Sequence, residues 1–75
     1  MDKKAIIAQL IKLLEINHID CMEAKTILRN SDYVSFLTVA EIAFALFTYA
    51  RDDKLDKQQI ENCKIIIDIL EAIAE

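Results

Sequence analysis

The residues that could carry out chemistry in this 75-residue chain are few and scattered. The chain has one histidine, His18, and two cysteines, Cys21 and Cys63. His18 lies close to Asp20 and Cys21, but a structural zinc ion needs four ligands at defined spacing. Cys63 would have to complete the set from another helix. We therefore expect His18 to be a surface residue in a turn and predict no metal site.

Three aspartates, Asp52, Asp53 and Asp56, lie between two expected helices, as carboxylates do in a helix–loop–helix calcium site. Such a loop needs oxygen ligands at alternate positions, a glycine at its sharp turn and a closing glutamate. Counted from Asp52, the turn position is Lys57 and the closing position is Cys63. The sequence therefore predicts no calcium site here.

Glu41 is a single carboxylate in the middle of the most apolar segment. Burial would raise its pKa and would require a partner such as Arg29, Arg51 or Tyr49. No second carboxylate, histidine or nucleophile lies near it in sequence, so we expect Glu41 on a solvated stripe or in an ion pair across an interface. We predict no catalytic, cofactor-binding or metal-binding residue, and we expect the chain not to be an enzyme.

The elements that position these residues are predicted to be helices. The chain has no glycine and no proline, which sheets and long loops normally need at turns and bulges. We predict a single all-α domain over residues 1–75, a small four-helix bundle of up-and-down type. The third helix is expected from about Tyr33 to Ala50.

Cap residues mark where the predicted helices begin and end. Asp2 and Asp20 are the expected N-caps of the first two helices, and Asp56 with Gln59 reaching back forms the capping box of the last. Asn17, which tolerates the left-handed conformation well, is expected to end the first helix. Asn30 is expected to end the second.

Apolar residues exceed what a small monomer can bury. Hydrophobic residues make up 55% of the chain, and the third helix is apolar around most of its circumference, with a milder stripe through Val34, Glu41 and Ala45. The first, third and last helices each show two apolar faces, whereas a bundle helix needs only an inner stripe. Surplus apolar surface usually marks an interface, so we predict a homodimer formed by the third and fourth helices. The candidate interface residues are Phe36, Phe44, Phe47, Tyr49, Ile66 and Ile73.

Charge and composition narrow the classes of partner. The formal net charge is −4, whereas nucleic-acid binders normally present a basic face, so we expect no nucleic acid. A membrane span needs about 20 apolar residues, and the interrupted apolar runs predict no membrane partner. Two cysteines at apolar positions and no recognisable signal peptide indicate the cytoplasm. The abundance of Ile, Lys, Asp and Asn is typical of a low-GC bacterium, a plasmid or a phage.

One stretch resembles the acyl carrier proteins. The similarity lies in length, acidity, four helices, and Ser35 at the start of a helix with Thr38, Val39 and Glu41 downstream. The resemblance implies a serine that carries phosphopantetheine. In that family the serine belongs to an Asp-Ser-Leu motif, whereas here Asp32 precedes Ser35 by three residues and Phe36 follows it.

The leading hypothesis is a non-catalytic protein–protein interaction module, a small regulator, inhibitor or adaptor that acts as a homodimer and binds a further protein. The alternative is an acyl-carrier-like domain modified on Ser35. A third alternative is a bundle that holds a lipid-like ligand in an apolar pocket.

Overall fold

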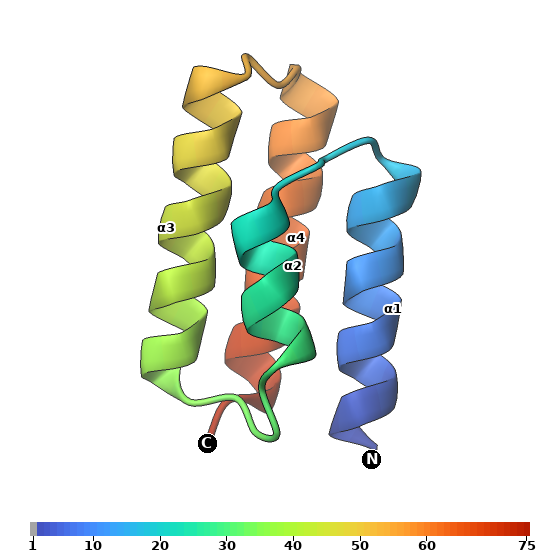
Figure 1. Ribbon diagram of the computed structural model, residues 1–75, viewed down its shortest axis with the longest axis vertical. Helices are drawn as coiled ribbons and strands as arrows, with labels where there is room; N and C mark the ends of the chain where they lie inside the picture. The colour runs from blue at the N-terminus through green and yellow to red at the C-terminus, as the bar shows by residue number, and fades with distance from the viewer. Residues whose placement is uncertain (1) are drawn as a thin grey trace.

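Four helices follow one another in alternating directions, so that the first and last residues described lie at the same end of the bundle (Figure 1). The computed structural model describes residues 2–75 and measures 32 × 22 × 19 Å along its principal axes. The helices are α1 (Lys3–Ile16), α2 (Met22–Arg29), α3 (Phe36–Asp52) and α4 (Lys57–Ile73). The prediction of an all-α, up-and-down four-helix bundle is confirmed.

Each helix packs on its neighbours in sequence, and α1 closes the bundle against α4. The side chains that meet in the centre are mainly Leu and Ile, and those that are less than 2% exposed include Leu10, Leu14, Ile19, Leu28, Ile42, Leu46, Ile66 and Leu70. Removing this much apolar surface from water is the main driving force for folding. Between residues 2 and 75, no helix is both long enough and apolar enough to cross a membrane.

The starts of the helices match the expected caps in two cases and differ in one. The Asp2 carboxylate accepts hydrogen bonds from the backbone N–H groups of Lys4 and Ala5. Asp56 and Gln59 form the complete capping box of α4, with bonds of 2.8 and 3.0 Å.

The prediction that Asp20 caps the second helix is wrong. Cys21 is the N-cap of α2 and makes no side-chain capping bond. The Asp20 backbone N–H instead donates to the Tyr49 hydroxyl at 3.2 Å, and the Cys21 thiol is buried and donates to the Ala45 carbonyl at 3.6 Å. Contacts with α3 therefore hold the chain before α2, and the helix begins one residue later than a cap at Asp20 would require.

Two helix ends use residues other than glycine in the left-handed conformation. After α1, Asn17 keeps a negative φ and His18 takes φ 57°, so the left-handed residue lies one position later than expected. The Ile19 N–H then donates to the Leu14 carbonyl at 2.9 Å, which completes a Schellman motif with both side chains buried. Lys54, with φ 53°, is the corresponding left-handed residue after α3.

The third helix begins at Phe36, three residues later than expected. Val34 is fully buried in the preceding turn, and its carbonyl accepts a hydrogen bond of 2.8 Å from the Glu75 N–H. This contact ties the turn to the end of the chain. Val34 and Ala45, expected on a mild stripe of the helix, both belong to the core, whereas Glu41 from that stripe is exposed.

Candidate interaction surface

Among residues 2–75, the large apolar side chains with the highest exposed fractions lie on the outer side of α3. Phe44 is 73% exposed, Leu37 is 69% exposed and Phe36 is 65% exposed, while Phe47 retains 39%. Residues separated by three, four or seven positions share one side of a helix, and Ala40, also exposed, lies among them. We call this surface the aromatic face of α3; it consists of Phe36, Leu37, Ala40, Phe44 and Phe47.

The opposite side of α3 is buried in the core of the bundle. Its buried residues are Val39, Ile42, Ala45, Leu46 and Ala50. These side chains pack against α2 and α4, the two helices that flank α3. The aromatic face is therefore additional to the core-facing stripe, and only Phe47 of its phenylalanines is more than half covered by the fold.

Charged residues lie beside the aromatic face. Glu41 is exposed, so the expectation that it lies on a solvated side of the helix is confirmed. Arg51 lies one turn beyond Phe47, and its guanidinium donates to the Asp52 carboxylate at 3.0 Å with both side chains largely exposed. Exposed pairs of this kind contribute little to stability. The apolar surface thus has a charged, hydrated margin, as the rim of a protein interface does.

The structure brings three of the six predicted interface residues together and separates the others. Phe36, Phe44 and Phe47 lie on the aromatic face. Tyr49 points the other way: it is half-buried, packs on the core, and its hydroxyl accepts the Asp20 N–H. Tyr49 therefore helps to hold the α1–α2 connection against α3.

Ile66 and Ile73 were also predicted to be interface residues, but the structure places both against the core. Ile66 is 1% exposed and lies in the core, and Ile73 is half-buried against it. The two apolar stripes of α4 both point inward because α4 packs against α3 on one side and α1 on the other. A helix that lies between two neighbouring helices buries a large part of its circumference.

Sequence reasoning missed Leu37 and a smaller apolar surface elsewhere. Leu37 lies seven positions before Phe44, and this spacing could have placed it on the same side of the helix. The second surface consists of Leu13 and Ile16 on α1 and Ile65 on α4, which are 37%, 62% and 50% exposed.

A polar network beside this second surface links α1 to α4. The Asn62 side chain donates to the Asn17 side chain at 2.8 Å, and Gln59 donates to the Asn17 carbonyl at 3.0 Å. Leu13 and Ile65 line a small cavity next to it. The network explains why Asn17 and Asn62 are half-buried, and it fixes the end of α1 against α4.

The chemically versatile residues do not gather into a cluster. His18 is exposed in the turn after α1, as expected. Both cysteines are free thiols within the core. The pKa of the Cys63 thiol is raised above its ordinary value, mainly by burial and to a smaller extent by the neighbouring Cys21 thiol. Over residues 2–75, the structure contains no group of three or more His, Cys, Asp or Glu side chains placed to hold a metal ion.

Ser35, the residue of the acyl-carrier-like alternative, caps α3. Its hydroxyl accepts the Thr38 N–H at 3.1 Å and shares a second hydrogen bond of 2.9 Å with the Thr38 hydroxyl. The side chain is half-buried. These bonds give Ser35 a structural role, and its modification stays a hypothesis. Incubation with a phosphopantetheinyl transferase and coenzyme A, followed by intact-mass analysis, tests that hypothesis, because unchanged mass would contradict it.

Comparison with protein-family models, with curated protein sequences and with solved structures found no match to this chain.

Proposed function

We propose that this protein is a non-catalytic interaction module that forms a homodimer through the aromatic face of α3. The observation that carries the proposal is the exposure of three phenylalanines and a leucine on one side of a helix whose other side already completes the core. Aromatic residues on a surface have an unfavourable contact with water, and a protein contact would remove it.

The size of the surface suits a small interface. The exposed parts of the three phenylalanines amount to roughly 350 Å², if a buried Phe covers about 200 Å². The largest apolar patch on a typical monomer is about 300–600 Å² and is often functional. A standard interface buries about 800 Å² on each partner. The aromatic face would therefore form the apolar centre of such an interface, and charged residues around it would form the rim.

The residue types also favour a protein partner. Aromatic side chains are enriched in interface centres because they bury a large area with few rotatable bonds. Ala40 places a small side chain among the phenylalanines, which would allow an aromatic ring of the second copy to approach the helix. A symmetric dimer uses the same surface twice, so a single self-complementary helix face suffices.

Regulation of a further protein is the wider role that we propose for this dimer. The second apolar surface, on Leu13, Ile16 and Ile65, would remain available for that partner. Two free, buried cysteines favour a reducing compartment such as the cytoplasm.

A matched pair of charge substitutions tests the proposal. Phe44→Asp places a carboxylate in the centre of the aromatic face, and we expect it to produce a monomer. Ile65→Asp, the control, introduces the same charge at an exposed position on α4 and should leave the dimer intact. Mass by light scattering after size exclusion measures both, with circular dichroism to check the fold. Equal mass for Phe44→Asp and the wild type would contradict the proposal.

A further inference from the structure

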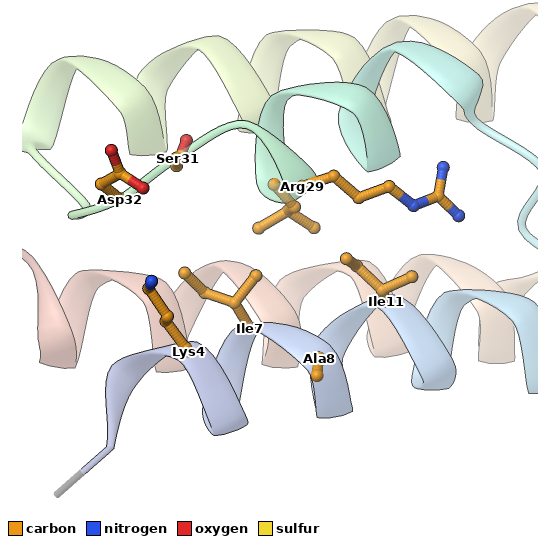
Figure 2. A pocket seen from close by; sticks show the side chains of 8 residues that line it. Lys4, Ile7, Ala8, Ile11, Arg29, Ser31 and Asp32 are labelled. Atoms are coloured by element: carbon orange, nitrogen blue, oxygen red, sulfur yellow. The ribbon is translucent and has the colours of Figure 1, made fainter.

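A separate groove lies between α1 and α2 (Figure 2). Its volume is about 290 Å³, close to the lower end of the range of about 300–1,000 Å³ for small-molecule sites. Two of the residues that line the groove have small side chains, Ala8 on α1 and Ser31 in the turn after α2. The Ser31 hydroxyl is held by the Ile27 carbonyl at 2.6 Å and turns away from the space.

The floor and one wall of this groove are apolar. Ile7 and Leu28 are buried beneath it, and the half-buried Ile11 borders it one turn further along α1. From Lys4 to Ile11 the wall of α1 is about 10 Å long, at a rise of 1.5 Å per residue. An extended acyl chain, whose carbon–carbon bonds are each about 1.5 Å long, needs about eight to ten carbons to span this length.

The two ends of the groove differ in charge. Lys4 and Asp32 lie at one end, so that this end carries one positive and one negative charge (Figure 2). The Arg29 side chain extends in the other direction, so that its guanidinium lies beyond Ile11 at the far end (Figure 2). No carboxylate lies within 4 Å of the Arg29 guanidinium in the part of the chain that the structure describes. A cation without an ion-pair partner thus borders an apolar groove on a protein of net charge −4.

We propose that the α1–α2 groove binds a medium-length acyl carboxylate, with its hydrocarbon chain over Ile7, Ala8 and Ile11 and its carboxylate on Arg29. A guanidinium presents paired N–H donors that match the two oxygens of a carboxylate. The apolar floor removes the methylene groups from water. The inference does not rest on the proposed dimer, because α1 and α3 occupy opposite sides of the bundle (Figure 1).

Titration of the whole chain with hexanoate, octanoate and decanoate, followed by two-dimensional NMR below the micelle concentration, tests this site. We expect shifts centred on residues 4–11 and 28–32. Affinity should rise by up to about fourfold for each added methylene group. Decyltrimethylammonium, which has the same chain length and the opposite charge, should bind more weakly than decanoate. Equal affinity for the two, or shifts confined to other parts of the bundle, would overturn the proposal.

Two variants, each with a matched control, locate the head group and the chain. Arg29→Gln should weaken decanoate binding about tenfold, in line with the loss of a charge-assisted hydrogen bond. Lys64→Gln removes an exposed cation on α4 and should change nothing. Ala8→Leu should fill the groove and abolish binding, whereas Ala72→Leu adds the same bulk at an exposed site on α4 and should not. Wild-type affinity in Arg29→Gln or in Ala8→Leu, with the fold intact by circular dichroism, would contradict the assignment.

Discussion

The two long helices α3 and α4 have the same length of 17 residues but use their apolar residues differently. α4 is rich in Ile and Leu, and it turns nearly all of them inward. α3 buries a comparable inner stripe and also presents three phenylalanines and a leucine on its outer side. Apart from Ile65, the apolar residues of α4 are therefore explained by folding alone, whereas the outer residues of α3 are not.

The difference shows that apolar content alone does not identify an interface. Both helices looked doubly apolar in sequence, yet Ile66 is 1% exposed and Phe44 is 73% exposed. The number of neighbouring helices and the arc that they cover decide which stripe remains outside. Branched aliphatic side chains fill the core of this bundle, and all three phenylalanines lie on the surface.

Truncation of one apolar side chain on each helix is the strongest test of this difference between α3 and α4. Leu70→Ala in the core of α4 should lower the free energy of unfolding by about 2–5 kcal/mol, because it removes buried methyl groups and leaves a cavity. Phe44→Ala on the outer side of α3 should change the stability of the monomer by less than about 0.5 kcal/mol. Urea denaturation at low protein concentration measures both values.

If Leu70→Ala prevents folding, Ile66→Val supplies the milder test. It should cost about 0.5–1.5 kcal/mol, still more than Phe44→Ala. Comparable losses at Ile66 and Phe44 would contradict the division between a folding face and a contact face.

The turn between α3 and α4 offers a stabilising change. Lys54 has φ 53°, a conformation that costs a residue with a Cβ roughly 1–2 kcal/mol. Lys54→Gly should raise the free energy of unfolding by about 0.5–1 kcal/mol, after the greater freedom of glycine in the unfolded chain is subtracted. Lys54→Ala keeps the Cβ and serves as the control. A gain of the same size in Lys54→Ala would show that loss of the lysine charge, and not backbone strain, was the cause.

The core side of α4 also predicts a pH dependence. Burial raises the pKa of the Cys63 thiol above its ordinary value of 9.0, so the unfolded chain releases this proton at lower pH than the folded protein does. The contribution of Cys63 to stability is therefore complete below about pH 8 and is lost as the pH rises through the unfolded and then the folded pKa. The difference in unfolding free energy between wild type and Cys63→Ala should narrow from about pH 8 to about pH 10. A constant difference would contradict the raised pKa.

Sequence patterns predicted much of the architecture, because the relevant interactions are local. The four helices, the caps at Asp2 and Asp56, and the exposed position of Glu41 follow from periodicity and from hydrogen bonds within a few residues. The start of α2 could not be predicted in this way, because Tyr49, distant in sequence, holds the Asp20 backbone. A propensity argument placed the left-handed residue at Asn17, whereas the Ile19–Leu14 packing places it at His18.

The surface was predictable only in part. Phe36, Phe44 and Phe47 were predicted to be interface residues, and the structure shows that all three lie on one outward side of α3. Helical spacing gave α4 two apolar stripes but could not tell that α1 and α3 would cover both. The groove beside Arg29 depends on how α1 and α2 meet, and no local pattern encodes that contact.

Sedimentation equilibrium of the wild-type chain over a concentration series tests the central claim most directly. If the aromatic face of α3 is a self-association surface, the mass should rise with concentration from the chain mass of 8.6 kDa to twice that value and then stay constant. A plateau at two copies is expected because a symmetric contact uses the face completely. A mass of one chain at every concentration would contradict the account, and continued growth beyond two copies would contradict a closed, symmetric contact.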